Sequence, residues 1–267
     1  MKYYLTAIGI IFLVLSFNAC KINPVSPVIN NNNNSVSGSS YYPNEDGNRY
    51  KYSIIRTDSA GNETTGSRSV TYDGTSNLGS VTYQIEVDTT TFSALINTTN
   101  SLFLKDSSGV SIILDTTGFS KIIPAAYQPY VVVNQTLKIF QSSFLNGNQW
   151  TAFDMSLKDG PITIDLVNVS ASFAGIEKIS LSLTSGTVID SAAKIQYNIK
   201  LNIPNANNPL AAPAASSYTA YAWLVNNIGV VQIQGNAFLL NAFAGNGINL
   251  ADTSGTITQS IVSYNIK

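Results

Sequence analysis

The chain has 267 residues, of which 44% are hydrophobic and only 11% charged, and its formal net charge is −1. Without a cluster of basic residues, such a chain lacks the charge that nucleic-acid binding requires. The sequence contains no histidine, which excludes a Ser-His-Asp triad, a histidine metal site and acid–base catalysis by histidine.

The N-terminus has the pattern of a secretory signal. Lys2 is the only charge before an apolar run over residues 5–17, and Ala19 and Cys20 follow shortly after that run. A short positive segment, an apolar stretch of roughly 13 residues and a small residue before the cleavage site predict a signal peptide over residues 1–19. The alternative, an uncleaved anchor, is disfavoured because a bilayer span needs about 20 apolar residues.

The pair Ala19-Cys20 resembles the lipobox of bacterial lipoproteins, although Phe17 and Asn18 depart from the usual leucine and small residue. In that family the cysteine is acylated and becomes the first residue of the mature chain. The resemblance therefore implies lipidation of Cys20 and attachment to a membrane through this anchor. Lys21, rather than aspartate, follows the cysteine, which by resemblance to enterobacterial sorting implies a cell-envelope location at the outer membrane.

Residues 20–40 predict a disordered tether that starts at the lipidated Cys20. They contain two prolines, an asparagine run over residues 30–34 and a Ser/Gly stretch, without a periodic apolar face. Such a segment buries too little apolar surface to offset its ordering entropy, and about 20 residues of coil reach roughly 25 Å. Residues 41–267 remain as a single antiparallel β domain, which is long enough for one sizeable core.

Apolar and polar residues alternate along much of this domain. The clearest case is residues 194–203, whose odd-numbered positions are apolar and whose even-numbered positions are polar. This period of two predicts a strand with one wet face, and hence an antiparallel sheet, with Tyr197 and Ile199 in the core and Asn198 outside it. The same pattern recurs at Val81, Tyr83, Ile85 and Val87, at Ile162, Ile164 and Leu166, and more weakly at Ile257, Ile261, Tyr264 and Ile266.

Turn motifs separate these runs. In each, an aspartate or asparagine can bond the backbone two residues on and a glycine can take the left-handed conformation, which predicts tight hairpins between about 12 to 14 strands. Short helical turns fit only near residues 120–127 and 238–243. The predicted fold is mainly β with little helix, a curved antiparallel meander that forms a half-barrel, a barrel or two packed sheets. The motifs are Asp58 to Gly61, Asp106 to Gly109, Asp115 to Gly118, Asp252 to Gly255, Asp73-Gly74, Asn146-Gly147 and Asp159-Gly160.

Two segments resemble lipoproteins of Bacteroidota-like lineages. Residues 41–52 read Tyr-Tyr-Pro-Asn-Glu-Asp-Gly-Asn-Arg-Tyr-Lys-Tyr, whereas those proteins begin with Tyr-Phe-Pro followed by Gly-Asn-x-Trp-x-Tyr. Residues 221–231 are similar to an aromatic and Gly-Val strand pair near their C-terminus, and Tyr50 stands where the family has tryptophan. The resemblance implies a curved antiparallel sheet, akin to the Lol-type lipoprotein carriers, and no established activity.

Few residues suggest catalysis. A carboxylate pair could cleave glycosides, but acidic residues in a strand with one face toward solvent are expected on that face. Ser191 and Lys194 match the Ser-x-x-Lys nucleophile motif, which needs a helix, whereas Lys194 opens a predicted strand. Residues 44–48 lack the spacing of a calcium-binding loop and predict a turn instead. We therefore expect a protein that is not an enzyme, with no catalytic residue, cofactor or metal. The acidic residues in strand-like segments are Glu86, Asp88, Asp154, Asp165 and Glu177.

Aromatic residues are the remaining candidates for ligand contacts, in particular Tyr50, Tyr52, Tyr221 and Trp223. Exposed rings could stack on sugars, whereas buried rings would fill a core. The two residues of each pair are separated by one position, so in a strand they share one face, which favours packing in the core. The sequence thus favours a lipid-anchored, non-enzymatic cell-envelope protein that binds an apolar ligand such as a lipid in a concave sheet. The alternative is an adhesin-like or glycan-binding interaction protein at the surface.

Overall fold

The computed structural model describes residues 38–92, 95–114, 127–203, 214–237 and 255–267, all of which belong to one compact unit, Ser35–Lys267. The predicted signal peptide, Cys20 and nearly all of the tether lie outside these residues. So do residues 115–126 and 238–254, which include two of the predicted turns and most of the predicted helical segments. Among the described residues no helix has the length and apolarity of a membrane span.

Thirteen antiparallel strands form a single sheet in the described part of the chain, which confirms the mainly β fold and falls within the predicted number of strands. Within the same described ranges, three single-turn 3-10 helices accompany the sheet, η1 (Gly38–Tyr41), η3 (Gln128–Tyr130) and η4 (Phe144–Asn146). The strands are β1 (Arg49–Thr57), β2 (Glu63–Leu78), β3 (Val81–Phe92), β4 (Leu95–Asp106), β5 (Gly109–Ile113), β6 (Val131–Val133), β7 (Thr136–Gln141), β8 (Trp150–Asp159), β9 (Ile162–Leu183), β10 (Gly186–Ile203), β11 (Ala214–Val225), β12 (Gly229–Asn236) and β13 (Thr256–Asn265).

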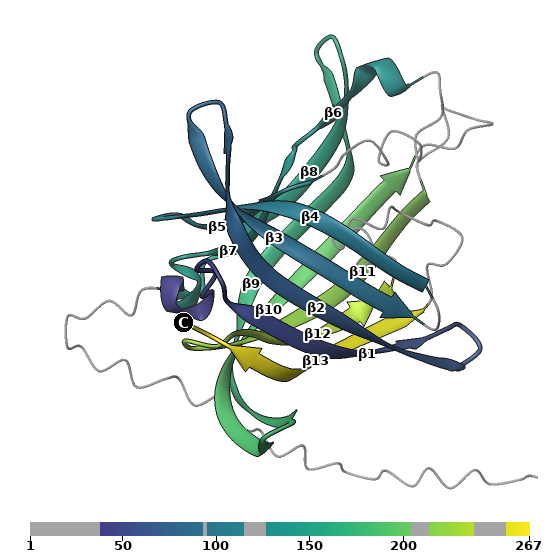
Figure 1. Ribbon diagram of the computed structural model, residues 1–267. Helices are drawn as coiled ribbons and strands as arrows, with labels where there is room; N and C mark the ends of the chain where they lie inside the picture. The colour runs from purple at the N-terminus through teal and green to yellow at the C-terminus, as the bar shows by residue number, and fades with distance from the viewer. Residues whose placement is uncertain (1–37, 93–94, 115–126, 204–213, 238–254) are drawn as a thin grey trace, which may run out of the picture. The chain divides into compact units, whose positions relative to one another are not determined.

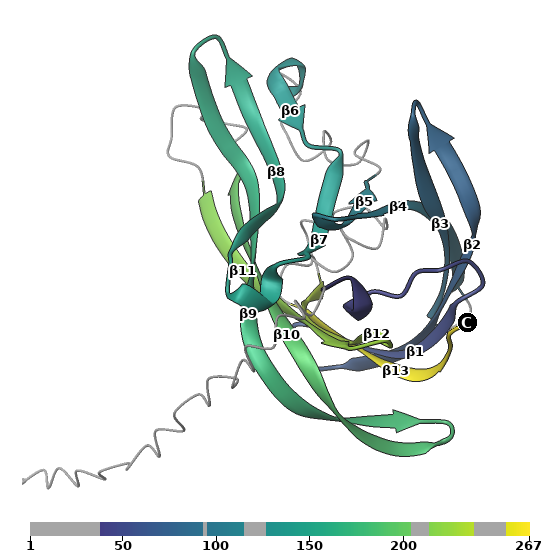
Figure 2. The ribbon, with the colours of Figure 1, turned by 90° about the vertical axis from the view of Figure 1, so that its left-hand side faces the viewer.

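The sheet follows the order of the chain over most of its width. Its strands run β6-β8-β9-β10-β11-β12-β13-β1-β2-β3-β4-β5-β7, so that the last strand, β13, pairs with the first, β1. The edge strands β6 and β7 are not paired with each other, and the sheet is therefore open rather than a closed barrel. Figures 1 and 2 show that it curls strongly. Of the three forms that the sequence left open, the structure has one curled, open sheet.

Side chains connect the two sides of this curl. The hydroxyl of Tyr197 in β10 donates to the carbonyl oxygen of Ile139 in β7 over 2.5 Å. The indole Nε1 of Trp150 in β8 donates to the carbonyl oxygen of Lys138, also in β7, over 3.2 Å. Strand β7 thus lies across the inner face from β10, as Figure 2 shows. The two hydrogen bonds show that inner-face side chains of both halves meet.

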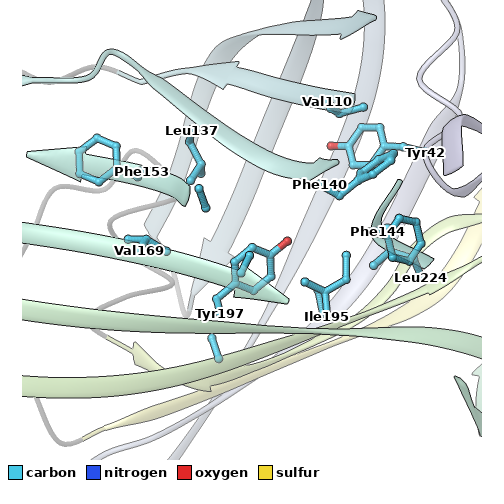
Figure 3. Close-up of a cluster of buried hydrophobic side chains, with 14 of the residues drawn as sticks. Tyr42, Val110, Leu137, Phe140, Phe144, Phe153, Val169, Ile195, Tyr197 and Leu224 are labelled. Carbon is cyan, nitrogen blue, oxygen red and sulfur yellow. The ribbon is translucent and has the colours of Figure 1, made fainter. Parts of the chain in front are cut away.

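The core occupies this inner face. Figure 3 shows part of it, with Tyr197 and Ile195 of β10 opposite Leu137 and Phe140 of β7. The segment before β1 adds to the core: the Tyr41 ring packs edge-on against Phe144 with centroids 5.4 Å apart, and Tyr42 stacks on Phe103 at 5.9 Å. Buried apolar surface of this kind is the main source of stability for a sheet that has no closed ladder.

The alternation in β10 is confirmed. Ile195, Tyr197, Ile199 and Leu201 are all buried, whereas Lys200 is exposed. The side chain of residue 203 lies outside the described part. Because β10 is flanked by β9 and β11 over most of its length, its pattern is set by one buried face and one face toward solvent.

In β3, β9 and β13 the predicted alternation of buried and exposed residues is only partly present. In β3, Tyr83 is buried as predicted, but Val81 is 37% exposed and Ile85 and Val87 are only partly buried, while Glu86 and Asp88 on the opposite face are buried. In β9, Leu166 is buried as predicted, but Ile162 and Ile164 are 58% and 39% exposed. These two isoleucines pair with the last residues of β8, at the tip of a hairpin that projects from the sheet in Figure 2. In β13, Ile257 and Ile261 are buried as predicted, whereas Tyr264 is exposed.

Most of the turn motifs that the structure describes form turns. The Asp58 carboxylate accepts the backbone N–H groups of Ala60 and Asn62, each over 2.8 Å, and Asp106 accepts that of Ser108 over 2.7 Å. Gly160 lies in the turn between β8 and β9. Asp73-Gly74 is different, because it forms an irregularity inside β2 rather than a hairpin turn.

Candidate ligand-binding cavity

The inner face of the sheet borders a cavity of about 190 Å³. It receives side chains from the strands around β1 and from β7 and β10 across the curl, and most of them are apolar or aromatic. Its walls include Tyr52, Val70, Tyr72, Phe103, Ile233 and Ile257. The inner-face side chains thus do not close completely on one another, and they leave an apolar hollow in the core.

Four tyrosine hydroxyls in the wall have partners within the protein. Tyr50 donates to the carbonyl oxygen of Pro43 over 2.7 Å, and Tyr52 donates to that of Val230 over 3.0 Å. The hydroxyl of Tyr72 lies 3.3 Å from that of Tyr42. Burial raises the pKa of all four hydroxyls, so they stay protonated at neutral pH. Their rings therefore form a neutral, largely apolar surface.

Four polar side chains gather on one part of the wall, which we call the polar end: Arg68 of β2, Glu86 and Asp88 of β3, and Gln259 of β13. Arg68 donates from Nε to Asp88 over 2.6 Å and from Nη2 to Glu86 over 3.2 Å. Its Nη1 lies 3.5 Å from Oε1 of Gln259. Arg68 thus joins all three other members of the polar end, and its guanidinium also lies 5.9 Å from the centre of the Tyr52 ring.

Burial sets the electrostatics of the polar end. The side chains of Glu86 and Asp88 are only 5% and 7% exposed, while that of Arg68 is 20% exposed. Burial raises the pKa of the Glu86 carboxyl, and Arg68 and Tyr72 oppose that rise only in part. Burial acts to lower the pKa of Arg68, but Asp88 and Glu86 outweigh it, and the net direction is upward. The arginine therefore stays charged.

The expectation that strand carboxylates lie on the solvent face is wrong for Glu86 and Asp88. Their burial is possible because Arg68 supplies an opposite charge and hydrogen bonds to both. It is confirmed for Asp154, Asp165 and Glu177, which are exposed. The sequence does contain a signal for the polar end. Arg68 has the same parity along its strand as the buried Val70 and Tyr72, and Gln259 lies between Ile257 and Ile261, so both are placed on a buried face.

The four aromatic candidates from the sequence lie on two different faces. Tyr50 and Tyr52 are buried on the inner face and line the cavity. Trp223 pairs with Lys194 in the β10–β11 ladder, and Tyr221 has the same parity, so both lie on the outer face, opposite the face of Ile195 and Tyr197. Trp223 is nevertheless buried, as predicted for core packing, and Tyr221 also borders the cavity. There the Lys194 ammonium stands 4.7 Å from the centre of each ring, and Trp223 donates to the Glu177 carboxylate.

No family model matches the sequence, and no curated protein does. Among solved structures, a protein described as exported, with a YmcC-like fold, from Bacteroides fragilis is 14% identical, with a TM-score of 0.44 over 84% of this chain and 98% of that one. A protein described as a lipoprotein from Parabacteroides distasonis is 13% identical, with a TM-score of 0.44 and the same coverage. The lipoprotein YmcC of Escherichia coli is 10% identical, with a TM-score of 0.28 over 86% of this chain and 90% of that one.

At these identities and TM-scores, the structural similarity does not indicate a function for this chain. The similarity to Lol-type lipoprotein carriers that its residues suggested is not shown by these structures.

Proposed function

We propose that this protein is a lipid-anchored, non-enzymatic binding protein of the cell envelope, and that its cavity takes up a small apolar ligand or the apolar part of a larger one, such as a lipid. The observation that supports this most directly is the apolar hollow of about 190 Å³ inside the curled sheet. An apolar cavity in which water has few partners is a favourable site for an apolar molecule.

The size of the cavity limits the ligand. At about 190 Å³ it is somewhat larger than an apolar cavity of roughly 150 Å³ that holds benzene. It is smaller than the pockets of about 300–1,000 Å³ that take drug-sized ligands. A single ring or a short length of acyl chain therefore fits, and a whole lipid would have to leave most of its volume outside.

The carboxylates beside the cavity support a binding role rather than a catalytic one. A general acid or base needs a proton that it can exchange with a bound substrate. Glu86 and Asp88 are both paired with Arg68, at 3.2 and 2.6 Å, and these contacts hold one oxygen of each carboxylate toward the arginine. We infer that their role is to place a polar group at one end of an apolar site.

Binding of toluene to the purified protein tests the proposal, because toluene has the size and apolarity of the expected ligand. We expect saturable binding by titration calorimetry or by shifts of the toluene NMR signals. Ala222→Leu, which adds an isopropyl group to a buried wall residue, should abolish binding. Ser217→Leu makes a matched change at an exposed position of the same strand and should leave binding intact. Absence of saturable binding, or equal effects of the two variants, would contradict the proposal.

The membrane anchor is tested separately. Cys20 is the only cysteine of the chain, and we propose that acyl chains on it hold the protein to the outer membrane. Metabolic labelling with an alkyne fatty acid should label the wild type and not Cys20→Ser, which should also leave the membrane fraction. Equal labelling of both proteins would refute the anchor without bearing on the cavity.

The alternative, an adhesin-like or glycan-binding surface, has less support. Sugar rings stack on exposed aromatic faces, whereas Trp223 is 6% exposed and its ring already faces the Lys194 ammonium. Of the pair on the outer face, only Tyr221 keeps partial exposure. A protein that binds no toluene but is retained on an immobilised glycan array would favour this alternative.

A further inference from the structure

One hydrogen-bond donor at the polar end has no partner among the described residues. Gln259 is 7% exposed and lines the cavity, and its Nε2 atom is buried without an acceptor. The amide cannot simply be reversed, because its Oε1 faces Nη1 of Arg68 and a guanidinium only donates. A buried donor without an acceptor is unfavourable. Nε2 itself has almost no accessible surface, so the Gln259 side chain must rotate slightly before an oxygen atom of a ligand in the cavity can accept from it.

The charges of the polar end restrict what that oxygen can belong to. Among the described residues that line the cavity, the charged ones are Arg68, Glu86 and Asp88. With both carboxylates ionised their sum is −1, and with one of them protonated it is zero. The guanidinium already donates to both carboxylates. A carboxylate or phosphate in the cavity would thus meet two acidic groups, in a medium of low dielectric constant and without an uncommitted cation.

A positively charged ligand fits the unpaired donor no better. An ammonium group has no lone pair, so it cannot accept a hydrogen bond from Nε2 of Gln259. With both carboxylates ionised, the polar end attracts a cation, but the carboxylates already accept hydrogen bonds from Arg68. Burying the ammonium group also adds a desolvation cost that opposes this attraction. An uncharged hydroxyl or carbonyl oxygen has neither defect, since it accepts from Nε2 and brings no charge into the apolar wall.

We propose that the cavity selects a small amphipathic ligand whose polar group is an uncharged hydrogen-bond acceptor, bound to Nε2 of Gln259, while its apolar body contacts the rings of Tyr52, Tyr72 and Phe103. The inference rests on the proposed function and names the class of ligand. Alcohols, phenols, esters and amides belong to this class. Free fatty acids and phosphorylated head groups are excluded from the polar end.

A matched set of one-ring probes tests this preference. Toluene, benzyl alcohol, benzoate and benzylamine share one ring and differ in the polar group, so their dissociation constants at neutral pH compare the groups directly. We expect benzyl alcohol to bind roughly three- to tenfold more tightly than toluene, as one added hydrogen bond would give. Benzoate and benzylamine should bind at least about tenfold more weakly than benzyl alcohol. In Gln259→Leu the advantage of benzyl alcohol over toluene should disappear while toluene still binds.

The outcomes separate the two proposals. If toluene binds but benzoate or benzylamine binds as tightly as benzyl alcohol, the selectivity is wrong and the apolar binding site stands. If Gln259→Leu keeps the preference for benzyl alcohol, Gln259 is not the recognising group and the inference fails. If neither toluene nor benzyl alcohol binds, the proposed function fails as well. The comparison within the wild type decides the selectivity even if the variant does not fold.

Discussion

Arg68 is the residue on which the polar end depends. Its guanidinium contacts two buried carboxylates, Glu86 and Asp88, and the amide of Gln259, so one side chain neutralises charge and satisfies acceptors from two other strands. Removal of one partner from such a group leaves charge buried without compensation, which is far costlier than loss of an exposed ion pair.

Arg68→Met should therefore destabilise the protein strongly. It keeps much of the side chain's length and removes the charge, and we expect a loss of about 2–4 kcal/mol in the free energy of unfolding, since Arg68 retains some contact with solvent. Arg49→Met changes an exposed arginine on the neighbouring strand β1 and should stay within about 0.5 kcal/mol. Denaturant titrations measure both. Similar effects of the two substitutions would mean that the polar end does not act as described.

Glu86 should make stability depend on pH in a specific direction. Because burial raises its pKa in the folded state, the native protein holds this proton more tightly than the unfolded chain does. This contribution to stability is complete below the ordinary glutamate pKa of 4.5 and is lost as the pH rises through the pKa of the folded state.

The substitution Glu86→Gln isolates that contribution. Other carboxylates, such as Asp58 and Asp106, whose pKa values are lowered by hydrogen bonds to Asn62 and Ser108, are present in both proteins and cancel in the difference. The stability of the wild type relative to Glu86→Gln should fall as the pH increases from about 4 to 8. Denaturation midpoints at several pH values give this difference. A constant difference, or one that grows with pH, would contradict a raised pKa.

At the scale of single strands, β10 offers the sharpest test of which face is buried. Ile199 is 4% exposed and its neighbour Lys200 points to solvent. Ile199→Ala should cost about 2–5 kcal/mol through lost burial and a new cavity, whereas Lys200→Ala should stay within about 0.5 kcal/mol. If thermal or denaturant unfolding shows equal losses for the two variants, β10 is buried on both faces or is in a different register.

The sequence predicts an element well where local pattern decides it. The faces of β10 follow from its own alternation, and the turns at Asp58 and Asp106 follow from an aspartate that bonds the backbone two residues on. The buried face of β3 could not be predicted in this way. Burial of Glu86 and Asp88 depends on Arg68 in another strand, and no pattern within β3 contains that partner.

At the scale of the whole domain, the sequence predicts a β meander but not how it curls. An open curl and a closed barrel differ in whether the edge strands pair, and that depends on contacts between distant residues such as Tyr197 and Ile139. The same limit applies to the candidate site. Parity shows that Tyr50 and Tyr52 share a face, as do Tyr221 and Trp223, but only the strand pairing reveals that the two faces differ.

The apolar cavity inside the curled sheet is the central claim, and a crystal structure under xenon pressure tests it most directly. Xenon enters dry apolar cavities and scatters anomalously, so its position can be located without ambiguity. We predict a xenon peak within the hollow bordered by Val70, Tyr72 and Phe103, away from Arg68, and no peak there in Ala222→Leu. A hollow filled by side chains or by hydrogen-bonded water, with no xenon, would contradict the claim.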